Sequence, residues 1–155
     1  MVETRKQRSD RQLTELLNEL RVALPGAQVL LAFLLAVPFA TRFGRVDGVE
    51  KVALFVALIS TVAGTLLLMA PPVYHRLRWG WGGKTDVIVV ASRLFLLGTG
   101  FLALGVLAAV YLVTSVLYDS VVAIVTTCVI GTAVLLIWYL LPLRRGSRPD
   151  VRARE

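Results

Sequence analysis

Four long apolar stretches constrain the fold of this chain more than any other feature of its sequence. They cover residues 22–41, 52–70, 87–113 and 121–141, and Arg93 in the third is the only charged residue within them. A helix needs ~20 mainly apolar residues to cross the hydrocarbon core of a bilayer. The hydrophobic share of the 155 residues, 57%, also exceeds the roughly 45–50% of soluble domains. We therefore predict an all-α membrane protein whose residues 22–143 form a four-transmembrane-helix bundle.

The segment before the first span is polar and divides into two parts. Residues 1–8 are predicted to be a disordered polar arm. Over residues 9–21, leucines recur at helical spacing on one face and charged side chains occupy the other. This pattern predicts a short amphipathic N-terminal helix that lies along the membrane surface. A helix that packs on the cytoplasmic face of a partner protein is the alternative.

The distribution of Lys and Arg predicts the orientation of the four spans. Fourteen of these 17 residues lie on one side, in the N-terminal arm, in and beside the 71–86 loop, and in the basic tail 144–155. Cytoplasmic segments of membrane proteins carry the excess of positive charge. We predict a multi-pass protein of the cell inner (plasma) membrane with both termini in the cytoplasm. Its net charge of +7 would attract anionic lipid headgroups, and no nucleic acid is expected as a partner.

The segment "APPVYHRLRW", residues 70–79, interrupts the apolar sequence. Pro71 and Pro72 are predicted to end the second helix where hydrocarbon gives way to headgroups. Aromatic and basic side chains that favour the membrane interface follow them: Tyr74, Arg76, Arg78, Trp79 and Trp81. His75 lies among these without a second His, Cys or carboxylate at ligand spacing, so no metal site is predicted. It either belongs to this interface or responds to pH.

Two polar residues within the spans are candidates for a function. Arg93 lies about two turns beyond Asp86, from where its side chain can extend back to the headgroups. The alternative is an arginine that faces the bundle interior and pairs with Glu19, Asp86 or an anionic substrate. Gln28 in the first span could join such a site.

Small residues recur within the spans at spacings that let helices approach closely. The glycines predicted to make these packing contacts are Gly64, Gly98, Gly105 and Gly131. They favour a compact bundle.

Three segments of the chain resemble a family of small bacterial four-span integral membrane proteins of unknown function. They are "LTELLNELRVALPGAQVLLAFLLAVPF", "APPVYHR" and "WYLLPL", and the resemblance covers residues 12–143. Members of that family are sometimes labelled sodium:proton antiporters. The resemblance implies the four-span topology and leaves the activity open.

No pattern in the sequence is typical of a catalytic, cofactor-binding or metal site. We therefore expect a non-enzymatic accessory or interaction subunit without cofactors. It would form a homo-oligomer or bind another membrane protein. The alternative is a small oligomeric ion or proton-coupled transporter or channel. Such transport normally needs an ionisable carboxylate or histidine near the midplane, and the four spans contain neither.

Overall fold

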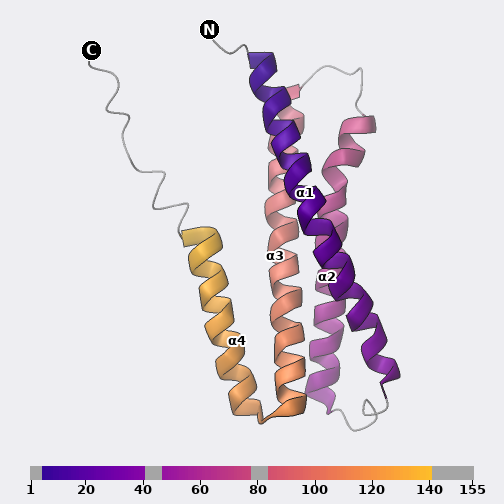
Figure 1. The fold of residues 1–155 in the computed structure, drawn as a ribbon, viewed down its shortest axis with the longest axis vertical. Coiled ribbons are helices and arrows are strands. Elements are labelled where there is room, and N and C mark those ends of the chain that lie inside the picture. The colour runs from indigo at the N-terminus through magenta and orange to yellow at the C-terminus, as the bar shows by residue number, and fades with distance from the viewer. Residues whose placement is uncertain (1–4, 41–46, 78–83, 141–155) are drawn as a thin grey trace, which may run out of the picture.

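A computed structural model describes residues 5–40, 47–77 and 84–140 of the chain. The helices are α1 (Arg5–Ala36), α2 (Gly48–Leu77), α3 (Lys84–Leu117) and α4 (Ser120–Leu135). A 3-10 turn, η1 (Val37–Phe39), follows α1, and a π-helical turn, η3 (Leu136–Leu140), extends α4. The helices run alternately up and down, so α1 and α3 begin at the same end of the molecule (Figure 1). The all-α bundle predicted from the sequence is confirmed.

All four helices are long and apolar enough to cross a membrane. The candidate spans are Asn18–Phe39, Gly48–Val73, Val90–Leu117 and Ser120–Trp138. Large apolar side chains such as Phe33 and Phe55 are mostly exposed on the surface of the chain, at 69% and 65%. A soluble monomer rarely leaves so much contiguous apolar surface in water, whereas lipid chains cover it without cost. The structure therefore supports a multi-pass membrane protein.

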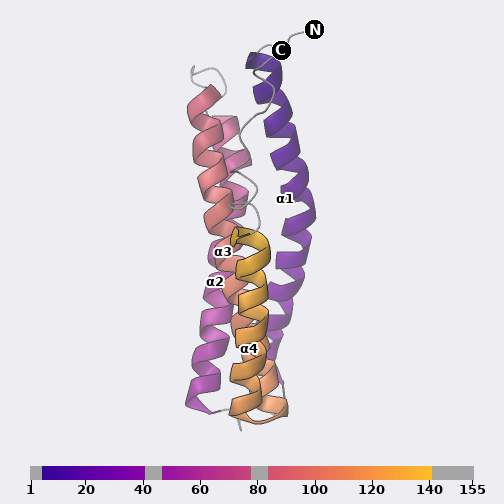
Figure 2. The ribbon, with the colours of Figure 1, turned by 90° about the vertical axis from the view of Figure 1, so that its left-hand side faces the viewer.

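Helix α1 differs from the prediction of a separate surface helix over residues 9–21. One continuous helix begins at Arg5, passes through Pro25 and ends at Ala36 (Figures 1 and 2). The buried residues Leu20, Ala27 and Leu34 recur every seventh position on both sides of the proline. This single packed line continues across Pro25, which explains why one missing N–H does not separate the two segments. The polar segment therefore extends the span along its own axis.

Helix α2 corrects the prediction that Pro71 and Pro72 end the second helix. Both prolines lie inside α2, which continues to Leu77. Pro71 is buried, as is Leu68 one turn before it. Neighbouring helices can hold a membrane helix together where prolines remove hydrogen bonds. Packing thus overrides the local tendency of the two prolines to break the helix.

Helices α2 and α3 form the most extensive contact in the molecule. The buried positions of α3 are Ala91, Gly98, Gly105 and Leu112, seven residues apart. Those of α2 include a series that alternates by three and four residues, Leu54, Ala57, Thr61, Gly64, Leu68 and Pro71; Ser60 and Thr65 are buried beside it. A seven-residue repeat of buried positions is the pattern of two helices wound around each other in a left-handed supercoil.

The two helices approach most closely where glycines face each other. A Cβ added at Gly64 would lie 2.9 Å from the Gly98 carbonyl oxygen, and one at Gly98 would lie 3.1 Å from that of Gly64. One heptad further along α3, a Cβ at Gly105 would lie 2.5 Å from Thr61 Oγ1. The backbones of α2 and α3 are therefore in direct contact, as the small-residue pattern predicts. Leu34 of α1 joins Leu54, Ala57 and Leu112 in the hydrophobic core at the other end of the seam.

Helix α4 is attached to the other three at one side only. Within the described part of the chain it packs against α3 and makes no close approach to α1 or α2. Asp119 begins the helix, and its carboxylate accepts a hydrogen bond of 2.7 Å from the Ser120 N–H. A Cβ added at Gly131 would meet Leu107 Cδ1 of α3 at 3.5 Å, an ordinary contact distance. Gly131 thus faces α3 with more room than Gly64 or Gly98 has.

We expect Gly64→Ala to lower the free energy of unfolding by about 1–3 kcal/mol, because its methyl group would force two backbones apart. Gly26→Ala is the matched control, since a Cβ at Gly26 has no neighbour within 4 Å. That variant should match wild type or gain up to about 1 kcal/mol from the better helix propensity of alanine. Unfolding in mixed detergent micelles, followed by circular dichroism, measures both. Equal stability of Gly64→Ala and wild type would contradict the contact.

Candidate functional site

The polar side chains best enclosed by the bundle lie on α2 against α3. Ser60, Thr61 and Thr65 are buried, and Thr61 has no exposed surface. The Thr61 hydroxyl donates to the Ala57 carbonyl at 2.7 Å, and the Thr65 hydroxyl donates to the Thr61 carbonyl at 2.7 Å. These bonds within one helix satisfy both hydroxyl protons at membrane depth. Thr61 and Thr65 were not predicted as interior residues, although the segment "STVAGT" marks a polar interruption of the second span.

One buried hydroxyl has no such bond. Thr127 Oγ1 on α4 is enclosed and lacks a hydrogen-bond partner within the described residues. On the same helix, Thr132 donates to the Cys128 carbonyl at 2.8 Å. Ala123 and Gly131, one turn on either side of Thr127, are the other small residues of its face. An unpaired hydroxyl in an apolar contact costs about 1–3 kcal/mol, so Thr127 is a local weakness of the α3–α4 contact.

Arg93 and Gln28, the two polar candidates within the spans, do not come together. Both are exposed, Gln28 on α1 and Arg93 on α3. The spans of α1 and α3 finish at the same end of the bundle, at Phe39 and Leu117. Gln28 lies eleven residues before Phe39, and Arg93 lies twenty-four residues before Leu117. At 1.5 Å per residue the two positions differ by roughly 20 Å along the bundle axis. The side chain of Asp86 lies outside the described residues.

The predicted interface residues fall at the edge of what the structure describes. The backbones of Tyr74, His75 and Arg76 belong to the last turns of α2. Their side chains, and all of Arg78, Trp79 and Trp81, lie outside the described residues. The roles assigned to them remain predictions.

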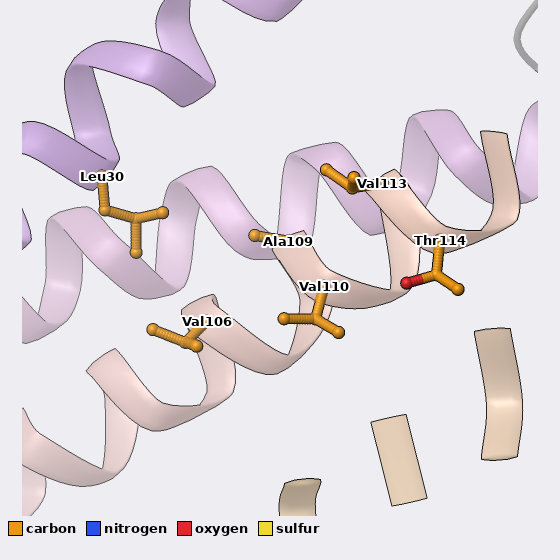
Figure 3. A pocket seen from close by; sticks show the side chains of 6 residues that line it. All are labelled: Leu30, Val106, Ala109, Val110, Val113 and Thr114. Carbon is orange, nitrogen blue, oxygen red and sulfur yellow. The ribbon is translucent and has the colours of Figure 1, made fainter. Parts of the chain in front are cut away.

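An open groove of about 330 Å³ lies on α3 beside α1. Leu30 of α1 forms one wall, and the floor is formed by Val106, Ala109, Val110, Val113 and Thr114 of α3 (Figure 3). The Thr114 hydroxyl is the only side-chain polar group in this lining. The groove is therefore suited to apolar chains, and no ionisable side chain lines it.

The described residues also contain no group of three His, Cys, Asp or Glu side chains that could hold a metal ion. Cys128 is a free thiol exposed on α4. The described carboxylates all lie before a candidate span or within its first turn: Glu15, Glu19, Asp47, Glu50 and Asp119.

Comparison with known proteins gives one match. The sequence profile of a family of unknown function (DUF6328) matches residues 2–142. The chain therefore belongs to this family. No curated protein and no solved structure matches it.

We expect Thr127→Val to keep or raise stability, by up to about 1 kcal/mol, because it replaces an unpaired buried hydroxyl with a methyl group of the same shape. Thr61→Val is the comparison variant, since it removes a hydroxyl that is bonded at 2.7 Å. It should cost about 0.5–1.5 kcal/mol. Detergent unfolding of the two variants provides the test. A larger loss for Thr127→Val than for Thr61→Val would mean that the Thr127 hydroxyl has a partner in another molecule.

Proposed function

We propose that this protein is a non-enzymatic accessory or interaction subunit of the membrane, and that α4 is the helix that meets its partner. The observation that carries the proposal is the uneven burial of the spans. Only 6% of the apolar part of α4 is buried by the rest of the chain, whereas 39% of the apolar part of α2 is buried. The partner is a second copy of this chain or another membrane protein.

The interior of the single chain supports this function over transport. Backbone contact between Gly64 and Gly98 leaves no passage along the α2–α3 seam. The buried hydroxyls of Thr61 and Thr65 are bonded within α2. Proton-coupled transport uses ionisable groups near the middle of the membrane, whereas each described carboxylate lies before a candidate span or within its first turn. A transporter or channel, including a sodium:proton antiporter, would have to be formed between copies.

The same proposal places the protein in the cell inner membrane with both termini in the cytoplasm. The excess of Lys and Arg at the N-terminal arm, the α2–α3 connection and the C-terminal tail supports this orientation. It also supports binding of anionic lipids on that side.

We expect the purified protein in sealed proteoliposomes to give no saturable flux under sodium, potassium or proton gradients, as reported by an internal pH dye or ion-selective dyes. Liposomes without protein are the control for leakage. A saturable, protein-dependent flux that Arg93→Ala abolishes would replace the accessory function with transport.

We also expect a photo-crosslinking amino acid at Val129 to give discrete protein adducts in native membranes. Val129 of α4 is 64% exposed, and Phe55 of α2, 65% exposed, is the matched control position. Mass spectrometry of the adducts identifies a second copy or a different protein. Lipid adducts alone from Val129, with the same yield as from Phe55, would contradict a partner at α4.

A further inference from the structure

The groove on α3 remains open in the folded chain. It extends along α3 from Leu30 of α1 at one end to Thr114 at the other (Figure 3). Val106 and Val113, which line it, are 41% and 55% exposed. A strip of apolar helix surface is therefore left for a molecule from outside the chain.

The depth of the groove corresponds to one leaflet of a bilayer. Helix α3 ends at Leu117, and two carboxylates mark the same end of the bundle, Asp119 before α4 and Glu50 in the first turn of α2. Thr114 is three residues, or roughly 4–5 Å, before the end of α3, and Val106 is eight residues, or roughly 12 Å, deeper. Half of a hydrocarbon core is ~15 Å thick. The groove therefore reaches from near the membrane surface to near the middle of the bilayer.

The hydroxyl of Thr114 differs from others on the same helix. The hydroxyls of Thr99 and Ser115 donate to carbonyl oxygens of α3, at 2.9 Å and 3.0 Å. The Thr114 hydroxyl makes no hydrogen bond to the part of the chain that the structure describes. Its oxygen lies on the side of Val110, toward the other lining residues (Figure 3). The hydrocarbon core holds no water to satisfy such a group, so the groove presents one donor that needs an acceptor.

The size of the groove favours a single hydrocarbon chain over a helix. Dividing its volume of about 330 Å³ by its length of roughly 12 Å gives a mean cross-section of about 27 Å². A helix with its side chains is ~10–12 Å wide, which is a cross-section of roughly 80–110 Å². A glycerophospholipid supplies both features that the groove requires. Its acyl chain is narrow and apolar, and its ester carbonyl is an acceptor at the boundary between headgroup and hydrocarbon.

We propose that the groove binds one acyl chain of a diacyl glycerophospholipid, whose ester carbonyl accepts a hydrogen bond from the Thr114 hydroxyl. The chain lies over Val110 and Val106 toward Leu30. The lipid belongs to the leaflet at the C-terminal end of α3. This site is formed by α1 and α3, so it does not depend on a partner at α4.

The test compares two lipids that differ only in the carbonyl groups, phosphatidylcholine with ester-linked chains and its ether-linked analogue. The full chain is placed in nanodiscs that contain equal parts of the two. Native mass spectrometry after release then measures the lipid retained by each chain. Wild type should retain about twofold to tenfold more ester lipid than ether lipid, the factor that corresponds to one net hydrogen bond. Equal retention of the two lipids by wild type would contradict the hydrogen bond.

Two pairs of variants locate the site. Thr114→Val removes the hydroxyl at nearly constant shape and should abolish the preference for ester lipid. Thr99→Val is its control, because that hydroxyl is already bonded to the Leu96 carbonyl, and it should keep the preference. Val106→Trp fills the groove and should lower the retention of both lipids. Leu104→Trp is its control at a position 46% exposed on the same helix and outside the groove lining, and it should retain lipid as wild type does.

Circular dichroism and thermal unfolding check that the variants keep the fold. A Thr114→Val protein that still prefers ester lipid would place the bound carbonyl elsewhere. Equal retention by Val106→Trp and Leu104→Trp would show that the lipid binds outside the groove. A wild-type dimer that retains no lipid, and that Val106→Trp dissociates, would identify a second copy of the chain as the molecule that covers the groove.

Discussion

The direct contact between the backbones of α2 and α3 is the interaction on which the rest of the structure depends. Lipid chains are as apolar as leucine, so membrane helices do not associate through burial from water. They gain from dispersion contacts, which require close approach, and side chains larger than hydrogen at Gly64 and Gly98 would prevent it. The seven-residue repeat on both helices extends this contact over much of their length. Helix α1 packs on the resulting pair, and α4 is added to its edge.

Much of the membrane architecture could be predicted because the thickness of the hydrocarbon core sets the length of each apolar segment in the sequence. The predicted span at 52–70 falls inside α2, and the described part of the predicted span at 121–141 falls on α4 and η3. The ends of the helices could not be predicted in the same way. An apolar segment shows which residues lie in the hydrocarbon core, and a helix can continue beyond that core. Helix α2 accordingly begins at Gly48 and runs to Leu77, through the two prolines that were expected to stop it.

The candidate site was less accessible to sequence reasoning. Spacing alone placed Gly64 on one face of its helix and Gly98 on one face of another, yet it could not show that these faces meet. That pairing depends on the register between helices, which only the folded chain defines. From the sequence, Arg93 and Gln28 could have shared one site. In the folded chain both side chains are exposed, and the two residues lie at different levels of the bundle.

The order of the contacts along the chain has a consequence for folding. Each helix packs against its neighbour in sequence, and α1–α3 is the only contact that skips a helix among the described elements. Such a chain closes mostly local loops, which makes assembly fast. During synthesis from the N-terminus, α2 and α3 can pair before α4 has left the ribosome. The helix that is inserted last is also the one held least tightly, so a nascent chain that lacks α4 can already contain the folded centre of the protein.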